Sequence, residues 1–64
     1  MKWTDINEIA IALSDTLPEI DPERVNFVDL MAWVKNLPDF HDPLGRCNEK
    51  ILEAIQQAWI DEVS

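Results

Sequence analysis

The chain has 64 residues, 47% of them hydrophobic, and 13 acidic against 5 basic side chains give it a net charge of −8 at pH 7. A chain of this length holds one domain with a thin core, because it buries only about 60% of the surface exposed on unfolding. The charge disfavours nucleic acid, whose phosphates are bound by lysine and arginine, and favours a basic protein surface or a cation as partner.

A first helix is predicted from about Asp5 to Thr16. Thr4 is a suitable N-cap, and the Asp5 carboxylate would favour the positive end of the helix. Apolar side chains then recur at helical spacing: Ile6, Ile9, Ala10, Leu13 and Leu17. Pro18 ends the helix, because proline disfavours helical geometry in the preceding residue and cannot donate a backbone hydrogen bond.

The middle of the chain predicts a turn and a second helix. Asp21 before Pro22 indicates a single helical turn, with proline at its first position, and residues 25–27 are expected to be briefly extended. The second helix covers about Asp29 to Asn36, since apolar residues recur at i, i+3, i+4 and i+7: Leu30, Trp33, Val34 and Leu37.

The rest of the chain predicts a loop and a third helix. Pro38 ends the second helix, and the segment to Arg46 contains two prolines and the only glycine, which indicates a loop. Phe40 is expected to plug this loop into the core. The third helix runs from Asn48 to about Glu62, with one apolar face: Ile51, Leu52, Ile55, Ala58 and Trp59.

These elements predict an all-α, mainly helical, single domain over residues 1–64, with the tryptophans Trp3, Trp33 and Trp59 in its core. Cys47 has no partner for an internal disulfide, and the N-terminal residues do not resemble a signal peptide. No run approaches the ~20 apolar residues that span a bilayer. We therefore expect a cytoplasmic protein that does not insert into membranes.

The chemistry-bearing residues do not form a catalytic pattern. The chain has one histidine, His41, and one cysteine, Cys47. It contains neither a glycine-rich phosphate loop nor a zinc-binding or calcium-binding motif. We expect no enzyme. Cys47 lies near the start of the third helix, where a helix dipole can lower the pKa of a thiol, although a small residue at a helix entrance is the simpler interpretation. Carboxylates, which suit hard cations when two or three converge, are abundant.

Two acidic strips are predicted on helix surfaces. On the first helix, steps of 100° place four residues opposite the apolar stripe: Asp5, Glu8, Ala12 and Asp15. On the third helix, Glu49 and Glu53 are neighbours at i and i+4, and Ile60 falls on the same face. The strips are either ordinary solvated faces or an electrostatic docking surface that also holds a cation weakly.

Short motifs are spread along the whole chain: Lys2-Trp3-Thr4-Asp5, Asp21-Pro22, Asp39-Phe40, Asn48-Glu49-Lys50-Ile51-Leu52-Glu53-Ala54-Ile55, Trp59 and Asp61-Glu62. In these motifs the sequence closely resembles the IscX family of bacterial iron–sulfur cluster assembly proteins. The block from Asn48 to Ile55 is the most specific of them. The sequence departs from the family at His41, where a further acid is usual, at Val28, where a polar cap would fit, and at Cys47, often serine.

The resemblance implies a winged-helix-like fold and a monomeric accessory protein that binds cysteine desulfurase. It further implies weak iron binding through surface carboxylates, modulation of the desulfurase, and competition with bacterial frataxin for the desulfurase's basic docking surface. Carried over by position, the partner-binding candidates are Asp5, Glu8, Asp39, Asp42, Glu49 and Glu53. Weak iron ligands would be Asp5, Glu8, Glu49 and Glu53.

Two other functions remain open on the sequence. The first is an iron donor or chaperone that delivers iron to the cluster scaffold, which requires tight, stoichiometric binding. The second is DNA binding, suggested only by the winged-helix-like fold. DNA binding would need a basic helix face, whereas Lys35 and Arg46 are isolated.

Overall fold

The computed structural model describes all 64 residues. It contains three α-helices and two 3₁₀ turns, which are α1 (Ile6–Thr16), η1 (Pro22–Arg24), α2 (Phe27–Lys35), η2 (Leu44–Arg46) and α3 (Glu49–Val63). No β-strand is formed, so the expectation of an all-α domain is confirmed, and the structure has no strands that could form a wing. None of the helices is long and apolar enough to cross a membrane.

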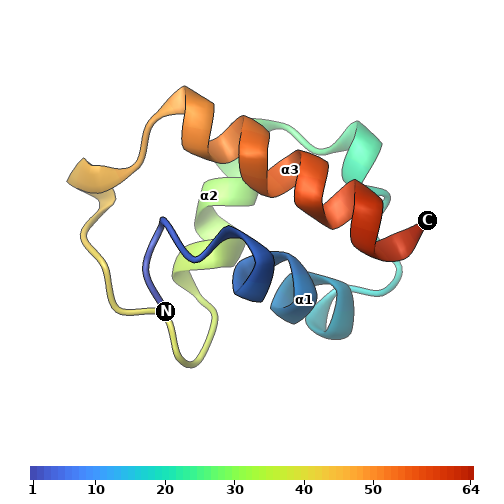
Figure 1. Ribbon diagram of the computed structural model, residues 1–64, viewed down its shortest axis with the longest axis horizontal. Coiled ribbons are helices and arrows are strands. Elements are labelled where there is room, and N and C mark those ends of the chain that lie inside the picture. Colours follow the sequence, from blue (N-terminus) through green and yellow to red (C-terminus); the bar gives the residue numbers. More distant parts are fainter.

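Helices α1 and α3 pack side by side and run in the same direction, with α2 behind them (Figure 1). Because they are parallel, their C-terminal ends lie at the same end of the molecule, where the chain also ends (Figure 1). The turn η1 packs against α3, and the Gln56 side-chain amide donates a hydrogen bond of 2.8 Å to the Pro22 carbonyl. This contact brings the segment between α1 and α2 close to α3.

The core is one cluster of buried apolar side chains from every helix and both flanking segments: Trp3, Ile9, Ala10, Leu13, Leu30, Val34, Leu37, Phe40, Leu52, Ile55 and Trp59. The prediction that Phe40 plugs the loop is confirmed, since its ring is buried 4.7 Å from that of Trp3 in an edge-on arrangement. Trp33 is only partly buried and packs edge-on against Trp59. Two of the three tryptophans are therefore fully enclosed.

The start of α1 differs from the prediction by one residue. The helix begins at Ile6, and Asp5 rather than Thr4 occupies the N-cap position. The Asp5 carboxylate caps no helical N–H and instead accepts a hydrogen bond of 2.8 Å from the backbone N–H of Lys2. The aspartate therefore ties the N-terminal segment to the helix.

Helix α2 begins two residues earlier than predicted. The Asn26 side chain accepts a hydrogen bond of 2.8 Å from the Asp29 N–H and so caps the helix, which makes Phe27 helical rather than extended. Val28 is consequently inside the first turn and is not a cap position. The third helix is capped in the same way by Asn48, as its predicted start requires, and continues to Val63.

The segment between α2 and α3 is held against the N-terminus by hydrogen bonds. The N-terminal ammonium donates to the Asp39 carbonyl at 2.6 Å, and the Trp3 N–H donates to the Asp42 carboxylate at 3.1 Å. The Trp3 indole N–H donates to the Pro43 carbonyl at 2.9 Å. The predicted loop is thus an ordered segment that covers the core around Trp3, and it includes η2, a turn that the sequence did not indicate.

Candidate functional site

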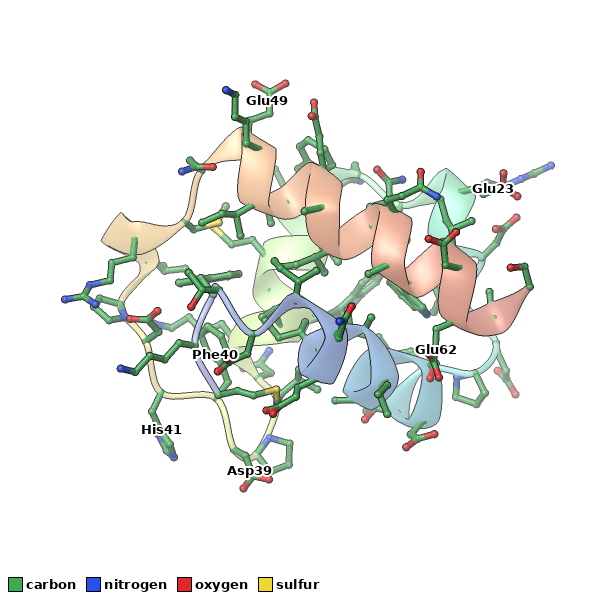
Figure 2. All side chains as sticks on the ribbon, in the orientation of Figure 1. Glu23, Asp39, Phe40, His41, Glu49 and Glu62 are labelled. Atoms are coloured by element: carbon green, nitrogen blue, oxygen red, sulfur yellow. The ribbon has the colours of Figure 1, made fainter.

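Glu49 and Glu53 lie together at the start of α3. Both are exposed and line a shallow polar depression with Asn48 and Lys50. Figure 2 shows Glu49 pointing away from the body of the protein. The N-terminal end of a helix carries partial positive charge, which stabilises nearby carboxylates, and Lys50 adds a cation beside them. This pair is therefore an acidic site whose potential is partly neutralised by its surroundings.

The predicted strip on α1 is only partly exposed. Glu8 and Asp15 face solvent, whereas Asp5 is partly buried and Ala12 packs against the core. The expectation that all four face away from the protein is wrong for Asp5 and Ala12. The reason for Asp5 is its hydrogen bond to the Lys2 N–H, which turns the carboxylate toward the N-terminal segment. Glu8 is thus the more accessible acid of the opening motif.

The two aspartates of the loop have different environments. Asp39 is exposed, and Figure 2 shows Asp39 and His41 at the edge of the molecule opposite Glu49. The Asp42 side chain is only 6% exposed, because its carboxylate accepts the Trp3 N–H and lies 3.9 Å from the Arg46 guanidinium. The six predicted partner-binding residues therefore do not form one surface, and Asp42 is engaged within the fold.

The predicted iron ligands do not converge. No three His, Cys, Asp or Glu side chains lie close enough together to hold a metal ion. Asp5 and Glu8 belong to the start of α1, and Glu49 and Glu53 to the start of α3, so the start of each helix offers one pair of carboxylates. The donor set does not fit a resident iron centre, which needs several ligands that the protein holds in place.

An acidic region that the sequence reasoning missed lies where α1 and α3 end. We call it the acidic end, and its residues are Asp15, Glu19, Asp21, Glu23, Asp61 and Glu62. Figure 2 shows Glu23 and Glu62 on this side of the molecule. Arg24 is the only cation within these segments, and its exposed guanidinium lies 3.5 Å from the Asp21 carboxylate.

The helix dipoles strengthen the negative potential of the acidic end. Neither α1 nor α3 has a basic residue in its last turn, where a lysine or arginine would be favourable. Both last turns instead contain acidic residues, Asp15 in α1 and Asp61 and Glu62 in α3. Such placement costs stability of about 0.3–1 kcal/mol for each charge. Acidic residues at a helix C-terminus, as in the Asp61-Glu62 motif, are the sequence signal that could have indicated this region.

Cys47 and Ile60 add little chemistry. Burial raises the pKa of the Cys47 thiol, so the lowered pKa considered for a helix entrance is not supported. The thiol lies 3.9 Å from the Asn48 carbonyl and packs at the margin of the core. Ile60 is partly buried. Neither side chain lines the depression beside Glu49.

The chain is similar to known proteins over nearly its whole length. A family model described as "Iron-sulphur cluster assembly" matches residues 1–64. A protein of Pseudomonas aeruginosa strain PAO1, itself described as uncharacterized, is 60% identical over 62 residues, which cover 97% of this chain and 94% of that protein. The matched region therefore includes every residue discussed above.

Proposed function

Because the chain belongs to the iron-sulphur cluster assembly family over its whole length, we propose that it is an accessory protein of the IscX type, which docks on cysteine desulfurase and modulates its activity. The observation that carries this proposal is the charge distribution. Thirteen carboxylates stand against five cations, and most of these carboxylates are exposed. Such a surface favours rapid, salt-sensitive association with a basic partner.

The acidic end is the principal docking surface in this proposal. It combines six carboxylates with the negative ends of two parallel helices and has one cation. The Glu49/Glu53 pair lies instead at the positive end of α3 beside Lys50. The potential that a basic surface meets is therefore more negative at the acidic end, and Glu8, Asp39, Glu49 and Glu53 contribute to longer-range steering. Frataxin would compete if it used the same basic surface.

Asp42 and Asp5 have a smaller part in docking than the sequence suggested. The Asp42 carboxylate is nearly enclosed and occupied by the Trp3 N–H, and that of Asp5 holds the Lys2 N–H. If either carboxylate bound a partner instead, its hydrogen bond to the backbone N–H within the fold would be lost. Their proposed role is to position the N-terminal segment.

Iron enters the proposal as a weakly held ion. Two carboxylates on one exposed helix face, such as Glu49 and Glu53, attract a hard cation but leave most of its coordination to water. No observation favours the alternative of an iron donor, which needs tighter binding than such pairs supply. Calorimetric titration with ferrous iron tests this. Stoichiometric binding, with an affinity far above that of an unrelated acidic protein, would support the iron-donor function instead.

DNA binding receives no support from the geometry. The five basic residues lie in five separate segments: Lys2 before α1, Arg24 in η1, Lys35 in α2, Arg46 in η2 and Lys50 in α3. A duplex would meet carboxylates on most faces, and phosphate contacts depend on clustered cations.

The experiment is calorimetric titration of the purified protein with cysteine desulfurase at low and moderate salt. Two charge-reversal variants are compared, Asp61→Lys/Glu62→Lys and Glu49→Lys/Glu53→Lys. Both change the net charge from −8 to −4. A difference in their affinity for the desulfurase therefore reports where on the surface the charge matters, and not the total charge. Lysine at the C-terminal end of α3 agrees with the helix dipole, so the first variant should fold.

We expect saturable binding that weakens with salt. The Asp61/Glu62 variant should bind at least about tenfold more weakly than wild type, and the Glu49/Glu53 variant no more than about threefold more weakly, as screened non-contact charges do. The reverse order would assign docking to the start of α3. Wild-type protein that does not bind the desulfurase in any condition would overturn the proposed partner.

A further inference from the structure

Helix α2 has apolar residues on both of its sides. Leu30 and Val34 face the core and are fully buried. Val28, Met31 and Ala32, at i, i+3 and i+4, form a second apolar stripe, and the charged Lys35 follows at i+7. With the η2 residue Leu44, these residues line a groove of about 310 Å³. We call it the α2 groove, and its residues are Val28, Met31, Ala32, Lys35, Asn36 and Leu44.

Three of the four apolar side chains of the α2 groove are exposed, and the fourth, Met31, is partly buried against the core. Val28 is 76% exposed and Leu44 44% exposed, and they come from segments far apart in the sequence. Neighbouring exposed apolar side chains, unlike single ones, mark contact surfaces. The outer face of α2 therefore resembles a helix face that a partner covers.

The charge of the α2 groove is opposite to that of the rest of the protein. None of the thirteen acidic residues lines it, and its one charged side chain is Lys35, at the last position of α2. The two salt bridges of the protein involve Arg24 and Arg46, so the Lys35 ammonium has no acidic partner within the chain. The groove thus offers an apolar floor with one free cation at its end.

This chemistry indicates the kind of occupant. A second copy is disfavoured, because each copy carries a charge of −8 and the six groove residues are few beside the roughly 20–30 residues that a stable interface uses on each side. A short amphipathic helix instead needs only a few apolar anchors in a groove. A carboxylate on that helix would pair with Lys35.

We propose that the α2 groove binds a short helical segment of another protein, with apolar side chains at i, i+4 and i+7 and an acidic residue that reaches Lys35. This site is separate from the acidic end. The protein can therefore hold a basic surface and an acidic amphipathic segment at the same time, as an adaptor between two partners would. The inference does not depend on the identity of the basic partner.

The test is a titration followed by backbone amide chemical shifts, at about 0.15 M salt to screen the overall charge. The probes are two alanine-based helical peptides with leucines at i, i+4 and i+7, one with glutamate in the next turn and the other with lysine at that position. They are titrated into wild type and into the variants Lys35→Glu and Val28→Asp. Both substituted side chains are exposed, so the variants should fold.

We expect the glutamate peptide to shift the amides of α2 and η2 saturably, and those around Glu49 little. Lys35→Glu should weaken the glutamate peptide about five- to tenfold and strengthen the lysine peptide, and Val28→Asp should weaken both. Absence of saturable shifts at millimolar peptide would overturn the proposal. Equal effects of Lys35→Glu on both peptides would refute the acidic chemistry. Groove shifts that depend on protein concentration without peptide would make the occupant a second copy.

Discussion

Replacing Asp42 by alanine should destabilise the fold, although Asp42 lies in a loop and is one of thirteen acidic residues, most of which are exposed. Its carboxylate accepts the backbone N–H of Trp3 at 3.1 Å, and the Trp3 residue is fully enclosed, so the substitution leaves a donor without an acceptor. The cost of such a loss is about 1–3 kcal/mol. The contact with Arg46, which is 70% exposed, adds well under 1 kcal/mol.

We therefore expect Asp42→Ala to lower the free energy of unfolding by about 2 kcal/mol. A chain of this size has about 3–10 kcal/mol in total, and each kcal/mol corresponds to about 4–8 °C in Tm, so the drop should be about 8–16 °C. Urea and thermal unfolding followed by circular dichroism measure both quantities. Asp42→Asn keeps an acceptor oxygen, so its free energy of unfolding should lie between those of Asp42→Ala and wild type.

Asp39→Ala is the matched control. Asp39 lies three residues away and is exposed, and only its backbone carbonyl is hydrogen-bonded. This substitution should change stability by less than about 0.5 kcal/mol. Equal losses in the Asp39 and Asp42 variants would refute the structural role that we assign to the Asp42 carboxylate.

Three further predictions follow from local geometry. Asn48→Ala should lose about 1 kcal/mol in urea unfolding because the cap of α3 is removed, whereas Asn7→Ala, within α1, should lose nothing. Trp3→Phe should cost about 1 kcal/mol more than Trp59→Phe, because the Trp3 indole N–H is bonded and that of Trp59 has no partner; equal costs would contradict this. Burial raises the pKa of the Cys47 thiol, so the pH midpoint of its alkylation should be higher in the native protein than in urea.

The sequence predicted the helices well because each depends on short-range signals. Apolar side chains at helical spacing located the three helices, and proline located the end of the first. The errors occurred at helix starts, where several polar residues competed for one cap. Thr4 and Asp5 were both suitable, and the hydrogen bond from the Lys2 N–H decided the conformation of Asp5. At α2, the capping residue Asn26 lay within the stretch predicted as extended.

The candidate site was less predictable, because a surface is assembled from residues far apart in the chain. Periodicity identified Glu49 and Glu53 as neighbours on one helix. It could not reveal that Asp42 turns inward to Trp3, since that contact spans 39 positions. It also could not reveal the α2 groove, because Leu44 reaches α2 only when the loop folds back.

The sequence by itself determined the composition of the surface and the identity of the core. A charge of −8 and regular apolar spacing made an acidic, helical domain the expected outcome whatever the packing. Only the tertiary structure decided which carboxylates lie near one another. Packing α1 parallel to α3 brings two helix C-terminal ends and their acidic residues to one end of the molecule. The sequence could not predict this, because periodicity describes a single helix, whereas the relative direction of two helices depends on how the core packs.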